Sequence, residues 1–386
     1  MRPRSKNSDA WSLNNSKLDS HDMANAQCFL SREEDSHKAL DALVDQINST
    51  QLEPDGVGVL VTSEHHRPQA EKLRGTLVTS AQLQTMTGTV SDASIVNGEA
   101  FFGEPMLGLL RWEPRPQTRP IALQLSRLGD HNLDNSIEAA LVLSSSATAG
   151  ALLASASKHD IFTMGAVSFA AEPTLQFHRD GSIIAGATGL GWQDSSAIAT
   201  TLIPSAEPLG ESHEITAAHE DVVIELDGRP AVDVLSETLN LPSKSAFDAI
   251  GTDYLIGIER NAHDYSQQIH RHITALDPVQ KMFSIGYPVE HGDRLVIGSR
   301  NRDSATRLLR EQVRQLRERI SDRKIDAIIF NGCIARGPAL FSGPSEEAAL
   351  ISEGFPGVPV LGVYGNGEFF AQELQSYAAV LTAILN

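Results

Sequence analysis

The spacing of hydrophobic residues changes along the chain and predicts both helices and strands. Over residues 33–49, apolar side chains recur at helical spacing and share one face, which predicts a helix. Residues 56–62 form a continuous apolar run of the kind found in buried strands. Over residues 161–192, short β-type runs alternate with glycines, and Asp180-Gly181 is a hairpin signal. The first half therefore combines a helix, a buried strand and an antiparallel region.

A second region of the same mixed type follows residues 194–219, where periodicity is weak and Pro204, Pro208 and Gly210 occur. We place the domain boundary in this stretch, after residue 210. Beyond it, the pattern predicts a strand, an Asp-Gly turn and a helix within 221–239, strands at 269–276 and 293–298, and an amphipathic helix at 304–320.

Further along the sequence, a strand, a helix and a strand follow one another. Residues 326–330 (DAIIF) and 358–363 are strand-like, and residues 344–352 carry acids in a predicted first helical turn. A crossover of this kind favours two adjacent parallel strands, whose carboxyl ends lie at the same edge of the sheet. The segments FNGCIARG (330–337) and YGNGEFF (364–370) should therefore lie side by side as glycine-rich loops.

These two segments carry the candidate ligand chemistry. The carboxyl edge of parallel strands is where α/β proteins build ligand crevices, and glycines there let backbone amides approach a small molecule. Arg336 offers a planar fork for a carboxylate or phosphate, Glu368 an acceptor for an amine, and Cys333 a polarizable thiol. Together they suit a small zwitterion. The predicted ligand-binding residues of these segments are Asn331, Cys333, Arg336, Gly337, Tyr364, Gly365, Asn366, Gly367 and Glu368.

Other roles for the same residues stay open. Cys333 could be a small buried apolar residue, and Arg336 and Glu368 could pair structurally, although a buried ion pair adds little net stability. Cys333 as nucleophile with Glu368 as acid or base would suit thiol-based acyl transfer or hydrolysis. Against this, neither segment contains a histidine, and a nearby carboxylate raises a thiol pKa. A protein-interaction scaffold without a ligand is the third hypothesis.

A shorter sequence in the first half matches part of the second segment. The tripeptide NGE at residues 97–99 recurs at 366–368, and both copies lie near apolar strands. Duplication of one α/β unit is a hypothesis that explains the match. It adds Asn97 and Glu99 to the candidate ligand-binding residues.

Composition and charge narrow the functional classes. With 386 residues, two domains are expected, and the formal net charge of −18 opposes binding to nucleic acids and anionic membranes. Two widely separated cysteines and the lack of a signal-peptide core or membrane span predict a cytoplasmic protein. The predicted divisions are a disordered tail at 1–30, an N-terminal module at 31–210 and a C-terminal module at 211–386.

Two further motifs have alternative explanations. His270 and His272 form an H-x-H pair of the kind that can hold zinc or iron, but no third ligand is fixed by spacing, so no metal or cofactor is predicted. The G-x-x-G-x-G pattern at 186–191 is not followed by a helix start, which argues against a phosphate loop.

From about Ala24 onward, the chain resembles the FIST family (F-box and intracellular signal transduction). The segments FNGCIARG, SEEAALI and PVLGVYGNGE are similar to the family's C-terminal module, and so are ELDGRPAVDVL (225–235) and HGDRLVIGSRNRDSA (291–305). GTVSDASIVNGE (88–99), MGAVSF and DGSIIAGATGLGW resemble the N-terminal module more loosely. The segment GEFFAQEL departs from the family pattern, in which a proline often follows GEI.

The resemblance implies a mixed α/β fold of two related modules, each with a mixed β-sheet and flanking helices. It also implies a non-catalytic sensory protein that binds a small ligand, with amino acids as the proposed ligands. Too few residues lie outside the two modules for a kinase, cyclase or F-box domain. The signal is therefore expected to pass to a separate protein partner.

Overall fold

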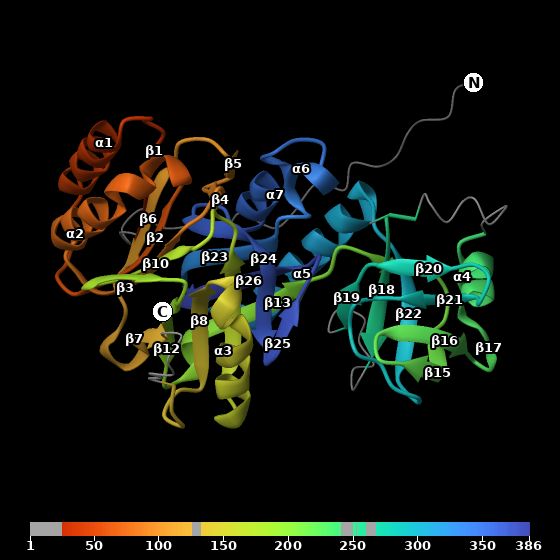
Figure 1. The fold of residues 1–386 in the computed structure, drawn as a ribbon. Helices are drawn as coiled ribbons and strands as arrows, with labels where there is room; N and C mark the ends of the chain where they lie inside the picture. The colour runs from red at the N-terminus through yellow and green to blue at the C-terminus, as the bar shows by residue number, and fades with distance from the viewer. Residues whose placement is uncertain (1–24, 126–132, 241–249, 252, 260–267) are drawn as a thin grey trace, which may run out of the picture.

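The computed structural model describes residues 25–125, 133–240, 250–251, 253–259 and 268–386. Strands in this part of the chain form three sheets with helices on their faces (Figure 1). This confirms the predicted mixed α/β class. No helix in the described ranges combines the length and apolar character needed to cross a membrane.

The first sheet is covered by two helices. Its six strands, in spatial order, are β1 (Ala26–Ser31), β6 (Leu107–Trp112), β2 (Gly56–Thr62), β3 (Leu83–Val90), β10 (Leu175–His178) and β11 (Gly181–Ile184). Helices α1 (Ser36–Asn48) and α2 (Ala70–Ser80) pack on its outer face, next to the 3-10 helix η1 (Glu64–Gln69). The predicted helix, buried strand and hairpin in this half are confirmed.

The predicted disordered tail of residues 1–30 is too long. Residues 1–24 lie outside the described part of the chain, but Ala26–Ser31 form β1, which pairs with β6. Ala26 and Phe29 are buried, so the strand is held by packing as well as by backbone hydrogen bonds. Its apolar residues are too few for a period to be recognised in the sequence.

The central sheet is the largest of the three. Its main path is β13 (Ile198–Ile203), β26 (Ala379–Leu385), β23 (Ile325–Cys333), β24 (Val360–Ala371), β9 (Phe162–Ser168), β8 (Ala139–Ser144), β12 (Ala187–Trp192) and β7 (Ile121–Leu125). Three short strands join β24 or each other, namely β25 (Glu373–Gln375), β4 (Ala93–Val96) and β5 (Glu99–Phe102). Its strands come from both sides of residue 210, so the predicted boundary divides the sequence but not this sheet.

The inner faces of the first and central sheets pack against each other. Alternation along β2 places Val57, Val59 and Val61 in this shared core, together with Ile329 and Leu361 of the central sheet. The outer face of the central sheet is covered by α3 (Ser146–Lys158), α5 (Arg302–Ile320), α6 (Gly337–Leu340) and α7 (Glu346–Gly354). The result is a helix, sheet, sheet, helix arrangement of layers.

Helix α5 begins two residues before the predicted start at residue 304. The Asn301 side chain accepts a hydrogen bond from the Ser304 amide at 3.0 Å, and the Ser304 hydroxyl faces the Asn301 backbone in a capping box. The predicted apolar stripe is buried as expected, at Leu309, Val313, Leu316 and Ile320.

The third sheet lies at the end of the molecule opposite α1 and α2 (Figure 1). Its main path is β19 (Ile269–Arg271), β18 (Tyr254–Glu259), β22 (Arg294–Ser299), β15 (His213–His219), β16 (Val222–Leu226), β21 (Met282–Ser284) and β20 (Ala275–Asp277), joined by β14 (Glu207–Pro208) and β17 (Arg229–Pro230). Helix α4 (Ala231–Thr238) packs against it. The predicted strand, Asp-Gly turn and helix of residues 221–239 are found here. Two 3-10 turns, η2 (Pro116–Thr118) and η3 (Ser195–Ala197), complete the described elements.

Candidate functional site

The carboxyl end of β23 lies beside the middle of β24, so the two glycine-rich segments are adjacent, as the sequence predicted. The two strands are parallel, and Cys333 pairs with Gly365. The glycine-rich segments are mostly strand rather than the predicted loops, because β26 pairs with β23 as far as Gly332 and β9 pairs with β24 as far as Ala371. The candidate residues are therefore held by the central sheet, and α7 lies in the connection between β23 and β24.

Arg336 lies directly after β23 and is fully buried. Its Nη2 is 2.5 Å and its Nε 2.7 Å from Oε1 of Glu347, and its Nη1 donates to the Ser205 hydroxyl at 2.7 Å. Tyr364 donates its hydroxyl proton to the other Glu347 oxygen at 3.2 Å. Nε and Nη1 of the guanidinium therefore donate hydrogen bonds, Nη2 has only its ion-pair contact, and the ion-pair partner is Glu347 rather than Glu368.

Glu368 is fully buried in β24. Among the described residues, neither of its carboxyl oxygens accepts a hydrogen bond of ordinary geometry. Burial raises the pKa of this carboxyl well above its usual range, against the smaller opposing effects of the Ala378 amide, Arg336 and Arg271. Burial therefore favours the neutral form of Glu368.

Cys333 ends β23 and is only 7% exposed. Burial, followed by the nearby Glu368 carboxyl, raises the pKa of its thiol to about 12. A thiol with so high a pKa is almost entirely protonated at neutral pH, and the thiolate is the reactive form of cysteine. The environment thus counts against Cys333 as a nucleophile.

Two arginines from the third sheet reach the same edge. Arg271 ends β19 and donates from Nη2 to the Leu374 carbonyl at 3.1 Å. Arg300 follows β22, donates to the Ala335 carbonyl, and lies over the Tyr377 ring at 5.6 Å from its centre. Burial is the main cause that lowers the pKa of each guanidinium. Arginine nevertheless stays protonated in proteins, so both bring positive charge to the edge.

Tyr377 connects the central sheet to the third sheet. Its hydroxyl lies 2.9 Å from Nδ1 of His272, which directly follows β19. Burial, followed by the Cys333 thiol, raises the pKa of the Tyr377 hydroxyl. His270 is fully buried, and burial lowers its pKa to about 4. The two histidines of the H-x-H pair thus have different environments, and no cluster of three metal-type ligands occurs in the described part of the chain.

The glycines of the site are surrounded by protein atoms. Gly337 has a φ of +44°, and a Cβ there would lie 2.5 Å from the Phe102 ring. A Cβ on Gly365 would lie 2.4 Å from the Val167 carbonyl oxygen in β9. We predicted that these glycines would let a ligand approach the backbone. At these two positions the space beside the glycine is instead occupied by a neighbouring strand or side chain. Asn366 is exposed.

Family comparison identifies both parts of the chain. The model of the FIST N domain matches residues 26–229, and that of the FIST C domain matches residues 231–371. The chain belongs to the FIST family. FIST domains are sensory and signal-transduction modules, and their division at residue 230 falls within β17 of the third sheet.

Curated relatives of this FIST protein include mycobacterial proteins that are named as uncharacterized. Uncharacterized protein MT0656 of Mycobacterium tuberculosis is 26% identical over 165 residues, which is 42% of this chain and 43% of that protein. Uncharacterized protein Mb0898c of Mycobacterium bovis is 26% identical over 165 residues, or 42% of each chain. The match thus spans less than half the length of these relatives.

Asn97 and Glu99 of the FIST N domain lie away from this edge. The Asn97 amide donates to the Val360 carbonyl at 3.0 Å, at the start of β24, while Glu368 lies eight residues further along the strand, or roughly 25 Å by strand rise. Glu99 forms an exposed ion pair with Arg32. The repeated tripeptide therefore does not form a second copy of the site beside the first, and its NG step is a hairpin turn with positive φ at both residues.

Several site residues were missed by sequence reasoning. Glu347 was seen only as a first-turn acid, although its position three and four residues before buried Leu350 and Ile351 places it on the buried face of α7. Arg300 directly follows a buried strand, which is a weak signal of a structural or functional charge. For Arg271 the sequence gives no signal, because its partner carbonyl lies about a hundred residues further along the chain.

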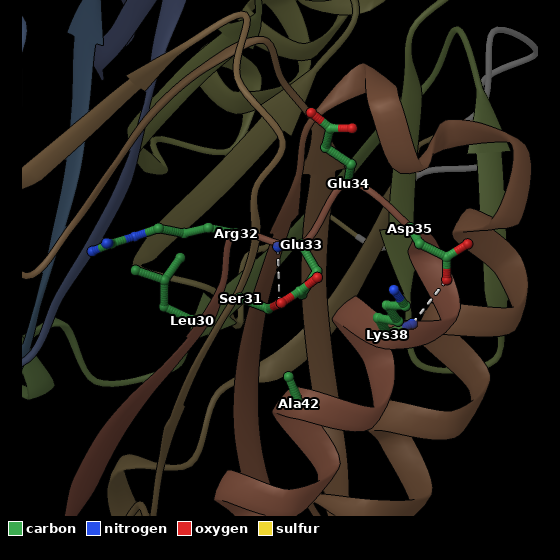
Figure 2. A pocket seen from close by; sticks show the side chains of 8 residues that line it. All are labelled: Leu30, Ser31, Arg32, Glu33, Glu34, Asp35, Lys38 and Ala42. Carbon is green, nitrogen blue, oxygen red and sulfur yellow. Dashed lines mark hydrogen bonds between the residues drawn. The ribbon is translucent and has the colours of Figure 1, made fainter.

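A surface hollow of about 680 Å³ separates the end of β1 from the start of α1 (Figure 2). Its lining consists of Leu30, Ser31, Arg32, Glu33, Glu34, Asp35, Lys38 and Ala42. Asp35 caps α1 by accepting hydrogen bonds from the His37 and Lys38 amides at 3.0 Å each, and Arg32 pairs with Glu99. Asp35 and Arg32 thus already make contacts within the protein, and we assign no ligand to the hollow.

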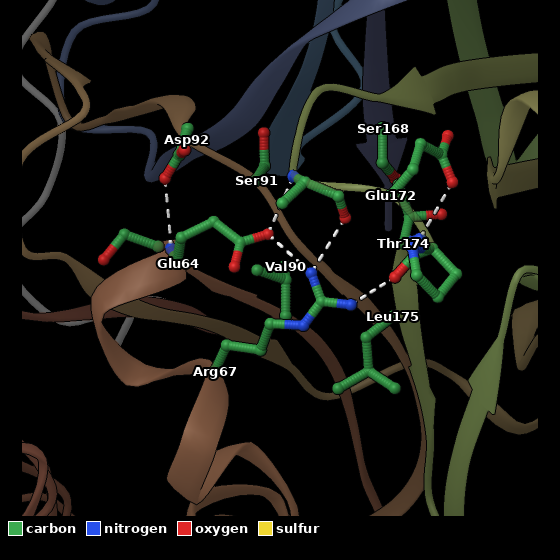
Figure 3. Close-up of polar contacts among 12 residues, drawn as sticks. Glu64, Arg67, Val90, Ser91, Asp92, Ser168, Glu172, Thr174 and Leu175 are labelled. Carbon is green, nitrogen blue, oxygen red and sulfur yellow. Dashed lines mark hydrogen bonds and ion pairs between the residues drawn. The ribbon is translucent and has the colours of Figure 1, made fainter.

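Another polar cluster fixes the loop that follows β9 (Figure 3). Arg67 donates from Nη1 to Glu64 Oε1 and to the Ala171 carbonyl, both at 2.8 Å. The same Glu64 oxygen accepts from the Ala171 amide at 2.9 Å, and Asp92 accepts from the Glu64 amide at 3.1 Å. These mutual contacts explain the cluster as a structural clamp.

Proposed function

We propose that this FIST protein is a non-catalytic sensor that binds a small zwitterion, such as an amino acid, at the junction of the central and third sheets. The observation that carries the proposal is the convergence of Glu368 and Cys333, at the carboxyl edge of the parallel strands, with Arg271 and Arg300 from the third sheet. The signal is proposed to pass to a separate protein partner.

The charges of the cluster support a ligand with two opposite charges. Arg336 and Glu347 neutralise each other, and burial favours the uncharged form of Glu368. Arg271 and Arg300 bring positive charge to the edge, and a ligand carboxylate beside Arg271 would form charge-assisted hydrogen bonds with it. An ammonium group beside Glu368 would in turn favour its carboxylate. A zwitterion would therefore interact with the arginine side chains and with Glu368, whereas a simple anion would interact only with the arginines.

A thermal-shift screen tests this proposal. The set comprises the twenty amino acids, the matching carboxylic acids without the amine, and the matching amines without the carboxylate. At a hundredfold excess over the dissociation constant, a ligand stabilises the folded state by about 2.7 kcal/mol. We expect a shift with at least one amino acid and a smaller shift with both of its singly charged analogues.

Three variants locate the binding site. Glu368→Gln should weaken the preference for the amine, and Arg271→Gln the preference for the carboxylate. Arg310→Gln is the control, because Arg310 is an exposed arginine on α5 and is not among the residues assigned to the proposed site. Binding that is unchanged in both site variants would refute the assigned location. A complete absence of shifts, together with a stable protein partner in a pulldown, would favour the scaffold hypothesis instead.

A further inference from the structure

Residues 207–299, which we call the appended unit, have a hydrophobic core of their own. The described members of this core include Ile215, Val223, Leu226, Leu235, Phe283 and Ile297. None of them belongs to the clusters that pack against the central sheet. Because the core is self-contained, the appended unit does not need the central sheet to bury its apolar residues, and its fold is compatible with movement as a body.

The chain passes between the appended unit and the central sheet at one place. The chain enters the appended unit after β13 and leaves it before α5. The first strand of the unit, β14, pairs with its last strand, β22. Glu207 pairs with Ser299, and Pro208 with Gly298. The two connecting segments are therefore adjacent. Rotation of the unit about the line through these two segments is the least restricted motion, as at a hinge.

A second attachment lies two strands from this hinge. In the third sheet, β18 separates β19 from β22, so the end of β19 is about 10 Å from the hinge strand. There Arg271 donates to the Leu374 carbonyl at 3.1 Å, and His272 contacts the Tyr377 hydroxyl at 2.9 Å. These contacts are polar, and they lie beside Glu368, which is among the charges that act on Arg271.

Tyr377 joins the hinge to the second attachment. Its ring lies below the Arg300 guanidinium, at the end of the hinge strand, while its hydroxyl contacts His272. The residue has a φ of +58°, a left-handed conformation that non-glycine residues seldom adopt. One side chain therefore contacts both His272 of the appended unit and Arg300, the first residue after the unit.

We propose that Tyr377 is a latch that holds the appended unit closed over the carboxyl edge of β23 and β24, and that release of this latch lets the unit swing about the β14 and β22 hinge. A ligand bound between Arg271 and Glu368 would touch both bodies, so it would bind the closed form better and shift the population toward it. This last step rests on the proposed function, whereas the hinge itself does not.

Distance measurements between spin labels test the latch in the full chain. Labels at Val279→Cys, which replaces an 86% exposed residue at the tip between β20 and β21, and at Glu353→Cys on α7 report on the two bodies. Cys28 is replaced by serine, and Cys333 is left in place because it is buried. The distance distribution is recorded by double electron–electron resonance without added ligand.

Two latch variants and one control are compared. Tyr377→Phe removes one hydrogen bond and should raise the ratio of open to closed form about fivefold, while Tyr377→Ala also removes the ring contact and should raise it further. Thr274→Ala is the control, because its hydroxyl bonds to Ser284 within the appended unit, and it should leave the distribution unchanged. Tyr377→Phe keeps the ring and its contact with Arg300. The test can therefore be made with this variant even if Tyr377→Ala fails to fold.

The outcomes separate the hinge from the ligand. A second distance population in the Tyr377 variants that the twenty-amino-acid mixture reverses would support both proposals. A second population that the mixture leaves unchanged would support the hinge and count against the zwitterion ligand. Identical distributions in the native chain, the Tyr377 variants and the control would overturn the latch, whatever the ligand screen shows.

Discussion

Replacing Glu347 by glutamine should be among the most destabilising single substitutions in α7. The change leaves the fully buried Arg336 guanidinium without a counter-charge, and a guanidinium cannot lose its proton at accessible pH. Removing one partner of a buried ion pair typically costs about 3–5 kcal/mol. The neighbouring residue supplies a matched control, because Glu346 pairs with Arg302, whose side chain is 51% exposed. Glu346→Gln should therefore cost less than about 1 kcal/mol.

The expected shift in melting temperature follows from the size of the chain. An unfolding entropy of about 2.1 cal/mol/K per residue gives roughly 0.8 kcal/mol/K for the whole protein. A loss of about 3–5 kcal/mol thus lowers the melting temperature by about 4–6 °C, compared with about 1 °C for Glu346→Gln. Differential scanning calorimetry of the two variants at pH 7.5 makes the comparison directly.

Two further variants complete this test. Arg336→Met should also be strongly destabilising, because it leaves the buried Glu347 carboxylate without its counter-charge. The double variant should be less destabilised than the sum of the single variants, because it leaves no unpaired charge. Equal melting temperatures for Glu346→Gln and Glu347→Gln would show that burial does not decide how much stability is lost when an ion pair is broken.

Three other predictions follow from the site and from the sheet. Iodoacetamide at pH 7 should label Cys333 far more slowly in the folded than in the unfolded chain, since a pKa of about 12 instead of 9.0 leaves about a thousandfold less thiolate; similar rates by mass spectrometry would contradict this. Because burial raises the Glu368 pKa, the native protein loses stability as pH rises from the unfolded value of 4.5 toward the folded one, so the melting temperature of Glu368→Gln relative to native should rise between pH 5 and pH 8, and a fall would exclude the raised pKa. In urea melts, Gly75→Ala in α2 should stabilise by about 0.5–1 kcal/mol, whereas Gly362→Ala should destabilise strongly, because its Cβ would lie 2.1 Å from the Phe330 carbonyl oxygen; a native-like Gly362→Ala would show that β23 can shift.

The local elements of this fold could be predicted from the sequence because their signals are local. The four apolar residues of α5 define one face of the helix, and the apolar runs of β23 and β24 frame α7 so that the crossover rule applies. The same rule places the segments FNGCIARG and YGNGEFF side by side. These are the parts of the site that depend on neighbouring residues in the chain.

The partners across the site could not be predicted in this way. Arg336 could pair with any acid that the fold brings near it, and the sequence does not rank Glu347 above Glu368. Arg271 and Arg300 reach the site only because the third sheet meets the central sheet there, and that contact depends on how two packed bodies fit together. The pairing of β13 with β26, across about 180 residues, is equally non-local.

The position of β24 in the central sheet has a consequence for biosynthesis. This strand lies between β23 and β9, so the earlier strands β9, β8, β12 and β7 have an open edge until the ribosome has produced residue 371. An open edge of backbone donors and acceptors is a template for pairing with other chains. The edge of β9 therefore stays open for about half of synthesis, from residue 168 to residue 371 of 386. A chaperone that holds nascent chains should raise the yield of this protein more than that of a protein whose sheets close in sequence order.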